Sequence, residues 1–117
     1  MSATTAFRIS AAMGFLAVAL GAFGAHGLAG LLEQNGRLET WETASFYHLT
    51  HAITLCVIGW RAPFVRGAWW CFLIGTLIFS GSLYTLSLTN IGVLGAITPI
   101  GGVALLVGWA WLAFSKH

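Results

Sequence analysis

The sequence predicts an all-α membrane protein, in which four transmembrane helices form one antiparallel bundle over residues 1–117. The first observation is composition: hydrophobic residues make up 58% of the chain and charged residues only 7%, whereas soluble domains contain about 25% charged residues. The second is that the apolar residues fall into long segments separated by short polar connections. So few charged side chains cannot cover a soluble domain of this size, and the lipid bilayer is therefore the predicted partner.

The first span is expected over residues 8–28, which is long enough to cross about 30 Å of hydrocarbon at about 1.5 Å per residue. Arg8 followed by an apolar run with small residues at positions 22 and 24 also fits a signal peptide, and we adopt the retained span. Small residues recur in this span at steps of three or four, a spacing that lets a second helix approach closely. The predicted packing positions are Gly14, Ala17, Gly21 and Gly24.

The longest connection, residues 29–43, contains all three acidic residues of the chain. Its spaced leucines indicate either a loop or a short helix that lies on the membrane surface, with Trp41 as an interfacial anchor. The second span is expected over residues 44–60. It ends before Pro63, which cannot continue a helix because it lacks the backbone N–H.

The third and fourth spans are expected over residues 68–88 and 93–114, joined by a tight turn into an antiparallel hairpin. Within the fourth span, Pro99 cannot donate a hydrogen bond to the carbonyl of Gly95, which is then left free inside the membrane. The packing positions predicted on this helix are Gly95, Pro99 and Gly102.

The basic residues predict how the bundle is oriented. Because such residues concentrate in cytoplasmic connections, the side of the bundle that holds both termini is predicted to face the cytoplasm, and Arg37 alone falls on the other side. Tryptophans near the cytoplasmic face are expected to form an aromatic belt. The basic residues on that side are Arg8, Arg61, Arg66 and Lys116, and the tryptophans are Trp60, Trp69, Trp70, Trp109 and Trp111.

Two histidines, His48 and His51, stand three residues apart inside the second apolar segment. At about 1.5 Å per residue they lie about 7 and 12 Å below the outer face, and polar residues of the other spans reach the same half. A neutral imidazole carries a donor and an acceptor that are costly to leave unpaired in lipid, so these side chains and that of His26 are expected to face the interior of the bundle. The candidate ligand-binding residues are His26, His48, His51, Ser80, Tyr84 and Thr98.

The predicted cluster admits two main interpretations. In the first, it binds or passes a small polar ligand, an ion or a lipid headgroup, and passage would need a homo-oligomer because four short spans enclose little volume. In the second, the protein is a structural or assembly factor whose polar residues only lock the helices together. A role as an accessory of an oxidoreductase is a third interpretation.

Other chemistry has little support in the sequence. The histidine pair has no cysteine or acid at equal depth, so no metal site is predicted, and Cys56 and Cys71 are expected to be buried thiols. No haem-attachment motif, phosphate loop, nucleophile elbow or paired carboxylates are present. We therefore predict no cofactor and no catalytic residue. A net charge of +2 without a basic cluster does not indicate nucleic-acid binding.

Four blocks of the sequence together resemble one family. They are residues 21–27 (GAFGAHG), 47–51 (YHLTH), 79–84 (FSGSLY) and 98–102 (TPIGG). In this order they are similar to the domain of unknown function 423 family, which includes transmembrane protein 256 and bacterial inner-membrane relatives. The likeness covers residues 7–114 and is greater to the bacterial branch. It implies an integral protein of the bacterial inner membrane with four spans, and it supplies no catalytic or binding residue of known role.

Overall fold

The computed structural model describes residues 1–116, and that part of the chain is helical without any strand. The all-α prediction is therefore confirmed. The elements are α1 (Ala3–Ala25), α2 (Ala29–Asn35), α3 (Leu38–Trp60), α4 (Arg66–Thr89), the 3-10 helix η1 (Gly92–Ala96) and α5 (Thr98–Phe114).

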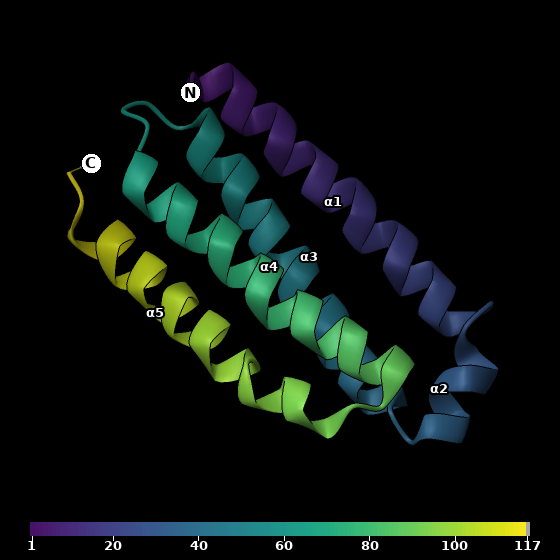
Figure 1. Ribbon diagram of the computed structural model, residues 1–117. Helices are drawn as coiled ribbons and strands as arrows, with labels where there is room; N and C mark the ends of the chain where they lie inside the picture. Colours follow the sequence, from purple (N-terminus) through teal and green to yellow (C-terminus); the bar gives the residue numbers. More distant parts are fainter. Residues whose placement is uncertain (117) are drawn as a thin grey trace.

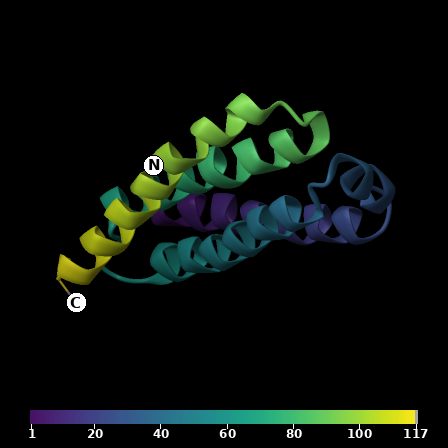
Figure 2. The ribbon, with the colours of Figure 1, turned by 90° about the horizontal axis from the view of Figure 1, so that it is seen from below.

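The four long helices pack in the order in which they occur in the chain. Helix α1 packs on α3, α3 packs on α4, and α4 packs on α5 (Figure 1). Within the described residues α1 and α5 do not approach each other, so the helices form an open row and not a closed bundle. The long helices run side by side, and both termini lie at one end along their axes, here called the terminal end. Helix α2 lies at the other, here called the α2 end (Figure 2).

Three segments are long and apolar enough to cross a membrane, and they are Ala3–Ala25, Arg66–Thr89 and Gly92–Phe114. Helix α3 has the same length as α1, 23 residues. It is less apolar because its interior carries His48, His51 and several threonines. The exposed surface of all four long helices is rich in large apolar side chains.

The connection before α3 contains a short helix, one of the two forms that the sequence left open. Residues 29–35 form α2, and Gly36 ends that helix with a positive φ of 67°, a conformation that suits glycine. The side-chain amide of Asn35 donates to the carbonyl of Ser87 at 3.0 Å, and Arg37 Nε donates to Asn90 Oδ1 at 2.9 Å. These bonds attach α2 and the following turn to the end of α4.

Helix α3 begins at Leu38 and not at residue 44 as predicted, and this early start changes the role of Trp41. The indole is 2% exposed, so its predicted place as an interfacial anchor is wrong. It packs over Gly24 of α1, where an added Cβ would lie 2.1 Å from Trp41 Nε1. Trp41 Nε1 also donates to the carbonyl of Leu20 at 3.0 Å. The absence of a side chain at Gly24 therefore seats the indole between α1 and α3.

The small residues of α1 divide into two groups. Ala17 is buried and Gly24 lies under Trp41, so these two pack within the chain as predicted. An added Cβ at Gly14 or Gly21 would meet no atom within 4 Å, so the predicted packing role of these two glycines is not seen in the single chain.

The close contact between α4 and α5 is made by a different glycine from those predicted. A Cβ on Gly101 would lie 2.4 Å from the backbone nitrogen of Phe79 and 2.9 Å from the carbonyl oxygen of Gly75. The same atom on Gly102 would lie 3.7 Å from the Phe79 ring, and on Gly95 3.9 Å from Leu86, which are ordinary contacts. Gly95 and Gly102 therefore contact α4, but the closest approach is at Gly101, which differs from Gly102 by about 100° in direction.

Pro99 does not interrupt a continuous fourth helix. It stands in the first turn of α5, after η1, where a proline needs no N–H donor and its fixed φ suits the helix. The sequence predicted a break inside one helix, whereas the structure has a junction between η1 and α5 at this point.

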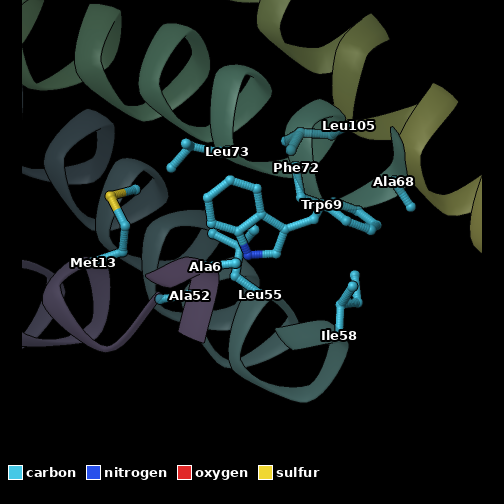
Figure 3. Packing of buried hydrophobic residues seen from close by; sticks show 10 residues of the cluster. All are labelled: Ala6, Met13, Ala52, Leu55, Ile58, Ala68, Trp69, Phe72, Leu73 and Leu105. Carbon is cyan, nitrogen blue, oxygen red and sulfur yellow. The ribbon is translucent and has the colours of Figure 1, made fainter. Parts of the chain in front are cut away.

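The apolar core lies toward the terminal end and is centred on Trp69 (Figure 3). Trp69 is fully buried, so it does not belong to the predicted aromatic belt, whereas Trp60 and Trp111 are exposed. Its Nε1 donates to Ser10 Oγ at 2.9 Å, and Ser10 Oγ donates to the carbonyl of Ala6 at 2.7 Å. The residues of the core are Ala6, Met13, Ala52, Leu55, Ile58, Ala68, Trp69, Phe72, Leu73 and Leu105.

Candidate functional site

The two histidines of α3 are both buried, as expected for imidazoles in an apolar environment, but they contact different helices. His48 is 4% exposed, and its Nδ1 lies 2.9 Å from Tyr84 Oη of α4. His51 is 6% exposed, and its Nε2 accepts a hydrogen bond from Trp109 Nε1 of α5 at 3.1 Å. The predicted single cluster is therefore divided between two helix interfaces.

His51 has both ring nitrogens occupied. The indole N–H of Trp109 can only donate, so His51 Nε2 is the acceptor and Nδ1 carries the proton. Nδ1 lies 2.8 Å from the carbonyl oxygen of Tyr47 and donates to it. The ring also stacks on Tyr47 and meets Phe72 and Trp109. These contacts favour the packing interpretation for His51.

His48 has only one of its nitrogens occupied. Its Nε2 is buried and makes no hydrogen bond within 3.5 Å among residues 1–116, although the Met13 backbone lies beside the ring. The hydroxyl of Thr76 on α4, itself 2% exposed, is also buried without a partner in that range. Most buried polar groups in proteins are hydrogen-bonded, so these two atoms are exceptions within the described residues.

Both atoms belong to residues that line one groove between α1 and α4, here called the His48 groove. Its volume is about 140 Å³, which is larger than a single water requires. No charged side chain lines it. The lining residues are Met13, Leu16, Leu20, His48, Thr76, Leu77, Ser80, Gly81 and Tyr84.

The other predicted site residues have separate places. Ser80 lines the groove, but its hydroxyl donates to the carbonyl of Ala44 at 2.8 Å. Thr98 Oγ1 lies 2.6 Å from Ser82 Oγ and joins the start of α5 to α4. His26 is an exposed residue that follows α1, so its predicted inward orientation is wrong. The chain turns away from the row at this point to form α2.

Three residues that matter here were not among the predicted site residues. Thr76 stands four residues before Ser80 on one face of α4, and this spacing could have identified it. Trp109 was assigned to the membrane interface, so its bond to His51 was not expected. Ser82 carried no signal that separated it from other serines of the segment.

A metal site is not formed by the described residues, since no three His, Cys, Asp or Glu side chains of residues 1–116 stand close enough to hold an ion. Cys56 and Cys71 are free thiols and are partly buried. No acidic residue, lysine or arginine lines the groove beside His48, and the nearest polar group is the Tyr84 hydroxyl. The chemistry that the groove offers is hydrogen bonding in an apolar surrounding.

The fold and the groove define a small helical membrane protein with a buried hydrogen-bonding site. Its sequence matches the family model described as Protein of unknown function (DUF423) over residues 20–102. The chain therefore belongs to the DUF423 family, and the resemblance seen in the sequence is confirmed.

The relatives of the chain come from bacteria and from yeast. The UPF0382 membrane protein YwdK of Bacillus subtilis is 48% identical over 100 residues, which cover 80% of each chain. A UPF0382 membrane protein of Haemophilus influenzae is 43% identical, with 88% of this chain and 86% of the relative covered. One of Schizosaccharomyces pombe is 34% identical, with 91% and 96% covered. No solved structure matches the chain.

Proposed function

We propose that this chain is an integral protein of the bacterial inner membrane with four spans and both termini in the cytoplasm. Helix α3 is as long as α1 and lies between α1 and α4, so it crosses the same layer as the three apolar segments. Arg8, Arg61, Arg66 and Lys116 stand toward the terminal end by sequence, which supports a cytoplasmic terminal end. The α2 end then faces the outside.

We further propose that the His48 groove binds a small molecule dissolved in the bilayer. The observation that carries this proposal is the pair of buried unpartnered atoms, His48 Nε2 and Thr76 Oγ1. Leaving such an atom without a partner costs about 1–3 kcal/mol. A ligand that supplies the missing hydrogen bond removes this cost. The free energy of binding is therefore more favourable by about 1–3 kcal/mol for each such atom.

The walls of the groove favour one chemical class of ligand. Leu16 and Leu77 line it and are about half exposed, so the groove opens to the lipid between α1 and α4. An ion would find no opposite charge there, because no charged residue lines the groove. The ligand is therefore an amphipathic molecule with an apolar body and an uncharged hydroxyl, carbonyl or carboxylic acid group that reaches His48.

The test uses a photoreactive probe in vesicles that contain the purified protein. A fatty alcohol that carries a diazirine is expected to label the buried Met13 in the groove, whereas the matching alkane without the hydroxyl labels exposed positions only, Leu77 among them. His48→Phe keeps the ring shape but removes Nε2, and it is expected to abolish the labelling that depends on the hydroxyl. The labelled residues are identified by mass spectrometry.

His51→Phe is the matched control for that experiment, because it removes an imidazole of the same helix that lies outside the groove. It is expected to leave the labelling unchanged. Equal labelling by the alcohol and the alkane in the unmodified protein would overturn the proposed binding function.

The second candidate function, a structural or assembly role, is supported by the bonds that join pairs of helices. His51 joins α3 to α5, Ser80 joins α4 to α3, and Thr98 joins α5 to α4. We also propose that any passage of a solute would require a homo-oligomer, because the groove of the single chain does not continue past the Trp69 core.

The packing role of His51 gives its own prediction. His51→Phe leaves the buried N–H of Trp109 without an acceptor, so the free energy of unfolding is expected to fall by about 1–3 kcal/mol. The measurement is the loss of helix, followed by circular dichroism, as sodium dodecyl sulfate replaces a mild detergent. Unchanged unfolding would show that the His51–Trp109 bond does not stabilise the row.

A further inference from the structure

A second cavity lies at the α2 end, between α1 and α3, and is here called the outer cavity. Its volume is about 180 Å³. Glu42 is an exposed residue on its wall, so a charged carboxylate lies at this cavity while none lies at the His48 groove. The hydroxyl of Ser45 also belongs to this wall; its Oγ is buried and makes no hydrogen bond within 3.5 Å in residues 1–116, and its nearest polar neighbour is the Tyr84 hydroxyl.

The outer cavity and the His48 groove are neighbours. Leu20 lines the groove and Gly21, the next residue of α1, lines the outer cavity. The rings of Trp41 and Tyr84 stand between them, with centroids 4.6 Å apart. Trp41 lines the outer cavity, whereas Tyr84 lines the groove and is bonded to His48.

The buried polar atoms without a partner mark a path across this boundary. In the described part of the chain they are Ser45 Oγ, His48 Nε2 and Thr76 Oγ1. Ser45 lines the outer cavity, and the other two line the groove. Water is the usual partner of buried polar atoms that the chain itself leaves unsatisfied.

The path has a closed far end. Thr76 lies about 20 Å from the end of α4 at Thr89, at about 1.5 Å per residue. Beyond it stand Met13 and Leu73, which belong to the apolar core around Trp69. The unpartnered polar atoms therefore lead from the α2 end to the groove and stop there.

We propose that water enters the outer cavity from the α2 end and reaches His48, and that the Trp41 indole closes this entrance. Its closing position is held by the hydrogen bond to the Leu20 carbonyl and by the space above Gly24. This inference deepens the proposed function and rests on it for the ligand. The apolar body of the ligand enters from the lipid, while its polar group can exchange a proton with water from the outer side.

The test measures which positions water-soluble ions can reach. In a chain whose Cys56 and Cys71 are replaced by alanine, Ser45→Cys and Thr76→Cys are exposed to Ag⁺ added outside spheroplasts. The protein is then unfolded and treated with a maleimide. Thiols that have already reacted with Ag⁺ are protected from the maleimide, and the protection is what is measured. Both positions are expected to react, whereas Leu49→Cys, which stands on the exposed face of α3 near the depth of His48, is expected not to react.

The role of Trp41 is tested by moving its indole. Gly24→Ala places a Cβ where Trp41 Nε1 now stands, and it is expected to raise the rate of reaction at Thr76→Cys about fivefold, the factor that the loss of one hydrogen bond gives. Gly21→Ala is the matched control, because its Cβ meets no atom within 4 Å, and it is expected to leave the rate unchanged.

Three results would overturn the inference. One is reaction at Ser45→Cys without reaction at Thr76→Cys, and another is equal reaction at Leu49→Cys and Thr76→Cys. The third is a Gly24→Ala rate equal to that of Gly21→Ala. The photoreactive alcohol separates this inference from the proposed function: if alcohol labelling fails while Thr76→Cys reacts, the ligand is wrong and the water entrance stands.

Discussion

Gly101→Ala is expected to lower the free energy of unfolding by about 1–3 kcal/mol, because overpacking a close helix contact forces the backbones apart. The new Cβ would stand 2.4 Å from the backbone nitrogen of Phe79 and 2.9 Å from the Gly75 oxygen. Backbone atoms cannot rotate away as a side chain can, so α5 has to move away from α4. The measurement is the midpoint of helix loss in sodium dodecyl sulfate.

Gly102→Ala is the matched control, at the next residue of the same helix. Its Cβ makes an ordinary contact of 3.7 Å with the Phe79 ring, and alanine favours a helix over glycine by about 0.5–1 kcal/mol. The control is therefore expected to keep or raise stability. If the two variants unfold alike, Gly101 does not set the distance between α4 and α5.

Trp69→Ala is expected to have the largest effect on stability, about 3–5 kcal/mol, as for other large aromatic side chains removed from a core. The ring stands at the centre of the core, among residues of α1, α3 and α5 (Figure 3). Its removal also takes away the donor to Ser10 Oγ. The effect is measured in the same detergent titration.

Trp70→Ala provides the comparison, because it removes the same side chain from the next residue. Trp70 is 41% exposed, whereas Trp69 is fully buried, so the loss is expected to be small. A comparable loss in both variants would show that the core is not centred on Trp69. Trp69→Phe, which keeps an aromatic ring, is expected to fall between the two.

The sequence was sufficient to predict the helical class and the approximate place of each long helix, because apolar length is a strong signal in this chain. It was also sufficient to predict that His48 and His51 are buried, since an unpaired imidazole is costly in an apolar layer. The start of α3 was misplaced because Glu39 and Glu42 look like a polar loop. In the structure they lie in the first two turns of α3, whose Trp41 faces α1.

The candidate site was harder to predict than the fold. Depth along a helix follows from counting residues, but direction depends on how the helices cross. His48 and His51 differ by about 60° around α3 at about 100° per residue, and this difference sends one ring to Tyr84 and the other to Trp109. Gly101 was missed by one residue for the same reason. His26 was misassigned because the sequence does not show where α1 ends.

The order of the row has a consequence for how the protein is made. Because each long helix packs on its neighbours in sequence, α1 with α3 and α4 with α5 form two hairpins whose contacts need no later segment. Helices that insert into a bilayer can associate afterwards, and contacts close in sequence form quickly. The first hairpin can therefore be complete while the second is still being synthesised. The contact of α3 with α4, together with the Trp69–Ser10 and His51–Trp109 bonds, then joins the two halves.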